Sequence, residues 1–258
     1  MQCPKCGVDQ PDGGILCIRC GIVFEKYYKY HPRPGDAPAA RPDPRAVTSA
    51  AQRRADPEMQ RPGLRELLLP ATLRGAWPSL AGRALLWIVL TWWGLSLISS
   101  SVASGAAGES FLHLVNLPFH EFGHLLFRPF GELMTALGGT LGQLLMPAIC
   151  LGVLLVRTQD PFGASVALWW LGENFLDIAP YINDARAGEL PLLGGNTGQS
   201  APYGFHDWQF ILGETGLLHL DQSLARGSHF IGSLIMLAAL AWGAVLLWRH
   251  LRQLQHRG

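Results

Sequence analysis

Two histidines spaced four residues apart, with a glutamate beside the first, lie inside an apolar run. Residues 117–127 read LPFHEFGHLLF, in which the ionisable residues are His120, Glu121 and His124. On a helix the two imidazoles share a face and can bind one Zn²⁺, while Glu121 is placed to take a proton from a metal-bound water. Ionisable groups are costly in lipid unless they face a protein interior and have a function. The pattern predicts a zinc hydrolase site.

A catalytic zinc normally has three protein ligands and one open position for water, so a third donor is needed. The apolar stretch of residues 163–182 and the residues after it supply acidic candidates, Asp177 and Asp184. His206 and Asp207, in the stretch FHDW of the following loop, are the remaining options. The spacing alone leaves these alternatives open.

The first 31 residues contain a second pattern with metal-ligand spacing. Cys3 and Cys6, then Cys17 and Cys20, form two Cys-x-x-Cys-Gly sequences, and the glycine after each pair lets the backbone bend. Four thiolates brought together in this way form a closed, tetrahedral zinc site. Closed sites of this kind are structural, so we expect a small zinc ribbon that docks a partner and has no chemistry of its own.

The composition separates a polar N-terminal region from an apolar remainder. Charged residues make up 15% of the chain, against about 25% in an ordinary soluble domain, and they concentrate in the first 75 residues and the last ten. The formal net charge of +1 does not indicate a nucleic-acid partner. We therefore expect an integral membrane protein in contact with a lipid bilayer.

The apolar stretches predict a mostly α-helical, polytopic membrane bundle. We expect four to five hydrophobic segments, one of them re-entrant, preceded by the small Cys₄ ribbon. The predicted domains are the ribbon at 1–31, a flexible basic linker rich in Pro and Ala at 32–75, and the membrane domain at 76–258. The expected segments are 84–102, 111–127, 133–156, 163–182 and 230–248.

Basic residues ahead of the first segment predict a cytoplasmic N-terminus. Following the segments in turn then places the polar stretch of residues 183–228 in the cytoplasm as well. Five full spans would leave the basic tail of residues 249–257 outside, against the positive-inside tendency. The Gly-rich third segment is our candidate for the re-entrant one, because irregular backbone is tolerated at membrane depth inside protein.

These residues resemble the site-2-protease-like intramembrane zinc metalloproteases. The resemblance covers about residues 83–186, from the HEFGH sequence in a hydrophobic segment to Asn174, Pro180 and Asp184 two segments later. It implies that His120, His124 and Asp184 bind the zinc and that Glu121 is the general base. The chain departs from the family pattern at Asp177 and Ala185, where the family has proline and glycine. Bacterial membrane proteins that combine a Cys₄ ribbon with His-Glu-x-Gly-His also resemble this chain, and imply a bacterial inner membrane.

The predicted function is zinc-dependent hydrolysis of peptide bonds in a membrane-associated protein or peptide substrate. It requires a catalytic zinc and a structural zinc, and the ribbon would recruit a substrate or a cytoplasmic protein partner. One alternative is a non-enzymatic membrane adaptor with a structural or degenerate intramembrane site. Another is a metal transporter, which should show polar residues along several segments.

Overall fold

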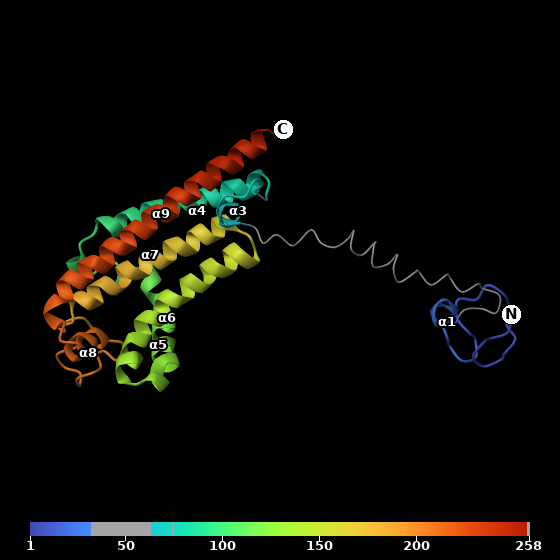
Figure 1. Cartoon of the computed structure of the whole chain (residues 1–258), viewed down its shortest axis with the longest axis horizontal. Coiled ribbons are helices and arrows are strands. Elements are labelled where there is room, and N and C mark those ends of the chain that lie inside the picture. The colour runs from blue at the N-terminus through green and yellow to red at the C-terminus, as the bar shows by residue number, and fades with distance from the viewer. Residues whose placement is uncertain (32–62, 74, 257–258) are drawn as a thin grey trace, which may run out of the picture. The chain divides into compact units, whose positions relative to one another are not determined.

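The computed structural model describes residues 1–31, 63–73 and 75–256. The chain divides into two compact units, Met1–Arg61 and Pro62–Gly258 (Figure 1). Most of the predicted linker, residues 32–62, lies outside the described residues. The remaining linker residues belong to the second unit: Trp242 Nε1 donates a hydrogen bond to the Leu68 carbonyl oxygen at 2.9 Å, and Leu73 is buried.

The first unit consists of two short knuckles and one helix. Isolated antiparallel bridges pair Gln2 with Asp9 and Leu16 with Val23, and each closes the base of a knuckle. Gly7 and Gly21 follow the second cysteine of each pair with φ of 71° and 69°, a conformation that glycine adopts without strain. Helix α1 (Phe24–Tyr30) follows, and Phe24 packs against the cysteines.

The second unit consists of helices joined by turns and by a long loop at residues 184–206, and the described part of the chain contains no β-strand. Its elements are α3 (Leu64–Leu68), α4 (Trp77–Ser99), the 3₁₀ turn η1 (Val102–Ser104), α5 (Phe111–Phe127), η2 (Arg128–Phe130), α6 (Glu132–Gly152), the π-helical turn η3 (Val153–Arg157), α7 (Pro161–Asn183), α8 (Asp207–Glu214), η4 (Leu218–Leu220) and α9 (Asp221–Gln255).

Three helical stretches among the described residues are long and apolar enough to cross a membrane, which is consistent with a membrane protein. They are Trp77–Ser99, Glu132–Arg157 and Leu218–Gln255. The predicted segments at 111–127 and 163–182 do form helices, α5 and α7, but they are not among these three. The structure thus confirms the helical bundle and does not confirm four to five spans.

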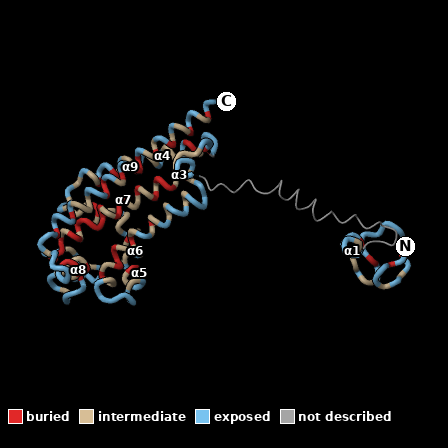
Figure 2. Tube along the Cα trace, viewed as in Figure 1, coloured by how far each residue is buried: buried red, intermediate tan, exposed pale blue. Residues whose placement is uncertain are grey.

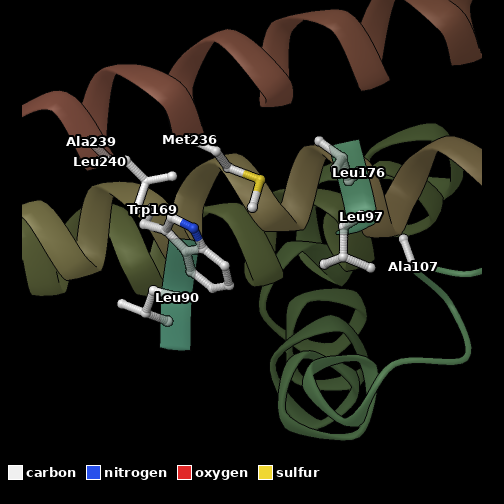
Figure 3. Close-up of a cluster of buried hydrophobic side chains, with 8 residues drawn as sticks. All are labelled: Leu90, Leu97, Ala107, Trp169, Leu176, Met236, Ala239 and Leu240. Atoms are coloured by element: carbon white, nitrogen blue, oxygen red, sulfur yellow. The ribbon is translucent and has the colours of Figure 1, made fainter. Parts of the chain in front are cut away.

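Helix α7 lies at the centre of the bundle. It packs mainly against α9 and α6, and Figure 2 shows buried residues along it while the outer helices expose long stretches. Trp169 and Leu176 of α7 meet Met236 of α9 and Leu90 of α4 in the largest buried apolar cluster (Figure 3). The exposed apolar side chains of α4, such as Trp92, face outward, as lipid-facing residues do.

Helix α5, with 17 residues, is shorter than α4, α6, α7 and α9. After α4 the chain turns back into the bundle, because Ala107 lies in the same apolar cluster as Leu97 and Leu176 (Figure 3). From there α5 runs antiparallel to the first half of α6, with Phe119 against Gly142 and His124 against Thr135. The Gly-rich segment that we predicted to be re-entrant forms the continuous helix α6, which belongs to one of the three stretches long enough to cross a membrane, whereas α5 does not.

Glycines bring the backbones of α5 and α6 into direct contact. A Cβ on Gly142 would clash with the carbonyl oxygen of Phe119, and a Cβ on Gly123 would clash with the carbonyl oxygen of Gly138. Small residues at helix interfaces allow this close approach in membranes. The contact holds the imidazole-bearing face of α5 at a fixed distance from α6.

We expect Gly142→Ala to destabilise the unit by about 1–3 kcal/mol, because the backbones must separate to admit the methyl group. Gly152→Ala is the matched control: it lies in the same helix, no atom lies within 4 Å of its added Cβ, and alanine favours a helix by up to about 1 kcal/mol over glycine. Thermal unfolding of both variants in detergent measures the difference. Equal midpoints for the two variants would contradict the contact.

Candidate metal centre

The two histidines of α5 share one face of the helix. The His120 and His124 rings lie with their centroids 4.8 Å apart. Together with Glu121 they form a group whose potential ligand atoms all lie within 4.8 Å of one another, close enough to hold a metal ion. The four-residue spacing along a helix of 3.6 residues per turn produces this geometry.

Both imidazoles are fixed through their Nδ1 atoms. His124 Nδ1 lies 2.8 Å from the Thr135 carbonyl oxygen, which can only accept, so Nδ1 carries the hydrogen. His120 Nδ1 lies 2.7 Å from Gln143 Oε1, and the Gln143 amide nitrogen donates to Asn174. In a neutral ring a protonated Nδ1 leaves the Nε2 lone pair free, which is the arrangement of a histidine that binds a metal.

The third group at this site is Asp207, the first residue of α8. Its Oδ2 lies 3.1 Å from His120 Nε2 and 3.3 Å from His124 Nε2. Burial would raise the pKa of Asp207, but its contacts with His120 and His124 outweigh burial and hold that pKa below its usual range. Asp207 is thus a carboxylate at neutral pH.

Two imidazole lone pairs and a carboxylate oxygen that meet at one point are three acceptors. Acceptors in mutual contact need a cation between them, either a proton or a metal ion. Two nitrogen donors and one oxygen donor are the ligand set that zinc takes in hydrolases, and both rings have the supporting hydrogen bonds that such ligands require. The residues present therefore fit a zinc ion.

Neighbouring side chains fix the position of Asp207. The Tyr181 hydroxyl accepts a hydrogen bond from the Asp207 backbone N–H at 3.0 Å and donates to Asp207 Oδ2 at 3.4 Å. The Tyr181 ring stacks on that of His206, with centroids 4.3 Å apart. His206 is the N-cap of α8: its Nδ1 accepts from the Gln209 backbone N–H, and burial lowers the pKa of this ring. Helix α8 therefore begins at a defined point beside the two imidazoles.

Asp184 lies elsewhere. Its two carboxylate oxygens accept from the backbone N–H groups of Glu189 and Leu190, both at 2.9 Å, and Oδ2 also takes the Nε2–H of His206 at 3.3 Å. Asp184 therefore holds the loop that leads to Asp207. The carboxylate beside the imidazoles comes from the FHDW stretch, where we predicted Asp184 to supply it. His206, one of our alternatives, is equally engaged in this loop.

Asp177, our other alternative, belongs to a polar network behind the site. Its carboxylate takes hydrogen bonds from His113 at 2.9 Å and from Asn116 at 3.0 Å. Gln143, which holds His120, also contacts Asp177 at 3.4 Å. This network ties one ligand of the site to the centre of the bundle.

A large cavity opens over the site. Its volume is about 1470 Å³, and it is bordered on one side by His120, Glu121 and His124 and on the other by the loop that follows α7. Its lining includes both polar and apolar residues; those of the loop include Leu190, Leu193, Tyr203 and Phe205. The cavity is large enough to take an extended peptide segment, since drug-sized ligand pockets range from about 300 to 1,000 Å³.

Sequence reasoning missed several residues of the site. Gln143, Asn116 and His113 received no role, although each is a polar residue in an apolar stretch, which is the signal of function in a membrane helix. The role of Tyr181 and that of the Thr135 carbonyl have no such signal, because both depend on how α6, α7 and α8 meet.

The four cysteines of the first unit come together as expected. Cys3, Cys6, Cys17 and Cys20 form a cluster that could hold a metal ion, and all four are free thiols. Cys3 Sγ lies 3.7 Å from Cys20 Sγ, and Cys6 Sγ lies 3.6 Å from Cys17 Sγ. The backbone N–H of Cys20 lowers the pKa of the Cys17 thiol to about 6, which favours the thiolate form that binds metals.

Glu121 completes the chemistry that the second unit offers. Its carboxylate borders the cavity beside the two imidazoles, within reach of a water held at the same point. A base, two imidazoles and a carboxylate at one wall of a large cavity are suited to hydrolysis. No protein-family model, curated protein or solved structure matches this chain.

Proposed function

We propose that this chain is a zinc-dependent intramembrane peptidase, similar to the site-2-protease-like enzymes, with His120, His124 and Asp207 as the zinc ligands. The observation that carries the proposal is the meeting of these three acceptors beside Glu121 at the wall of a large cavity. Three acceptors in mutual contact are costly unless a cation lies between them, so a purely structural helix contact has no need of this arrangement.

A zinc ion held by these residues would lower the pKa of a water ligand to about 7 and polarise a carbonyl group. Glu121 takes the proton of the attacking water and passes it to the departing amine nitrogen. Gln143 and the Thr135 carbonyl keep both imidazoles in the tautomer that leaves Nε2 free. A helical substrate must unwind locally to enter, since an intact helix shields its carbonyl groups.

The ribbon unit has the role of a recruiting module in this proposal. Its Cys₄ cluster is closed, so it offers no open position for a substrate. A module tethered to an enzyme raises the effective concentration of whatever it binds. We propose that it binds a substrate or a protein partner, and that the whole chain is an integral membrane protein of a bacterial inner membrane.

Zinc content together with cleavage tests the proposal. The purified full chain is expected to contain two zinc ions, and Cys17→Ser is expected to leave one. Chelation should stop the cleavage of a membrane protein substrate, and added zinc should restore it, in both the parent chain and Cys17→Ser. A single ion that Cys17→Ser removes would instead identify a membrane adaptor with a structural ribbon and no peptidase centre.

A further inference from the structure

The beginning of α4 and the end of α9 lie at the same end of the bundle. The Leu73 backbone N–H donates to Gln253 Oε1 at 2.8 Å, and Gln253 Nε2 donates back to the Leu73 carbonyl oxygen at 3.0 Å. His250 Nε2 lies 3.3 Å from the Gly75 carbonyl oxygen. We call this end, with residues 73, 75–83, 157–161 and 249–255, the arginine end.

Helix α7 starts at the arginine end and finishes at the other. Arg83 of α4 lies 3.5 Å from Asp160, immediately before the first residue of α7. A helix of 23 residues is about 34 Å long, so its last residue, Asn183, lies a bilayer thickness away. Helix α9 begins there, and Arg186 pairs with Asp221 at 2.8 Å. We call this second end, residues 183–221, the site end.

The cavity opens at the site end. The residues that border it include Leu190 and Tyr203 of the loop after α7 and Glu214 of α8, and none of its lining residues belongs to the arginine end. The full length of α7 separates residue 83 from residue 183. This placement at opposite ends of the bundle argues against our expectation that residue 83 and residues 183–228 share one side of the membrane.

Basic residues distinguish the two ends. The described residues of the arginine end include Arg83, Arg157, Arg249 and Arg252, with Asp160 as the acidic partner of Arg83. At the site end and around the cavity, Arg186 is paired with Asp221, Arg128 borders the cavity, and Arg226 follows Asp221 in α9. These three arginines are outnumbered there by acidic residues, which include Glu109, Glu121, Glu132, Asp184, Glu189, Asp207, Glu214 and Asp221. Arginine and lysine are retained on the cytoplasmic side of membrane proteins.

We propose that the arginine end is cytoplasmic and that the zinc site opens on the opposite, extracytoplasmic side. Resting on the proposed peptidase function, this assigns the substrate class: membrane proteins whose cleaved bond lies towards the extracytoplasmic end of a spanning segment. Both ends of the membrane unit then lie in the cytoplasm, which removes the conflict between five spans and a basic tail.

Thiol labelling in sealed membranes tests the sidedness. The parent is the full chain carrying Cys150→Ala, and two single substitutions are compared in it, Gly194→Cys in the cavity loop and Thr158→Cys at the arginine end. Both positions are exposed, and no atom lies within 4 Å of a Cβ on Gly194. Right-side-out vesicles from a bacterial expression host are treated with a membrane-impermeant maleimide, before and after permeabilisation.

The expected result is full labelling of Gly194→Cys in sealed vesicles and labelling of Thr158→Cys only after permeabilisation. The reverse pattern, or labelling of both positions from one side, would overturn the proposal. The labelling of the four ribbon cysteines is measured in the parent chain and subtracted from that of each variant. Because labelling needs no catalysis, the same experiment in the Glu121→Gln background gives the sidedness even if the peptidase proposal fails.

The position of the cut tests the substrate class. With the active chain, mass spectrometry of the products is expected to place the cleaved bond in the extracytoplasmic half of the substrate segment. A cut in the cytoplasmic half, together with outside labelling of Gly194→Cys, would overturn the substrate class while leaving the sidedness intact.

Discussion

Replacing Glu121 with Gln is expected to reduce peptide cleavage by about 10³-fold, within the range that a positioned general base contributes. The amide keeps the size of the side chain but cannot take a proton from water. Because Glu121 is not one of the three groups that meet at the site, zinc content should stay at two ions per chain. Single-turnover cleavage and metal analysis of the same preparation measure the two quantities.

Glu132→Gln is the matched control for that experiment. Glu132 borders the same cavity, at the start of α6. Its carboxylate does not belong to the cluster of ligand atoms formed by His120, Glu121 and His124. Its replacement removes the same charge from the cavity wall, so we expect cleavage within about threefold of the parent, as for a surface charge of small effect. Cleavage by Glu121→Gln at the rate of Glu132→Gln would refute the role of Glu121.

Replacing Asp207 with Ala is expected to weaken zinc binding at the membrane site by more than about 100-fold. Loss of a group that merely supports a ligand costs about 10–100-fold in metal affinity, and Asp207 meets both imidazoles directly. A competition titration with a chromogenic chelator measures the affinity, and the Cys₄ cluster contributes a constant second ion.

The variant Asp184→Asn distinguishes the role of Asp184 from that of Asp207. The amide oxygen still accepts one of the two loop N–H groups, but the amide nitrogen cannot accept the other. Because the side chain at this position only supports the loop and does not meet the imidazoles, the expected loss of zinc affinity is about tenfold. Thermal unfolding in the presence of chelator shows whether either variant is damaged apart from the metal. If Asp184→Asn lost the ion while Asp207→Ala kept it, the ligand set derived from the structure would be wrong and the one implied by family resemblance right.

Local patterns predicted the elements of the membrane unit well. The segment at 111–127 coincides with α5, and 163–182 lies within α7. Helix α9 is longer than the predicted 230–248, because its two ends carry polar residues that hydropathy reads as loop. Its first turns cover the site end, and its last turns, through His250 and Gln253, hold the segment before α4.

The third ligand could not be predicted because it depends on a contact between distant residues. His120 and Asp207 are 87 residues apart in the sequence. Asp184 stands at a position that family resemblance favours, and only the folded loop shows its oxygens occupied by the Glu189 and Leu190 N–H groups. His120 and His124, in contrast, were predictable, since helical spacing alone places them together.

The loop from Asp184 to Asp207 forms one border of the cavity and also supplies the carboxylate that meets the imidazoles. If this loop opened as far as its contact with Tyr181 to admit an unwound polypeptide, Asp207 would leave His120 and His124. In the proposed peptidase, admission of a substrate and retention of the zinc would then oppose each other. In the proposed peptidase, a small molecule bound beneath this loop would inhibit cleavage by releasing the zinc, without contacting the zinc itself.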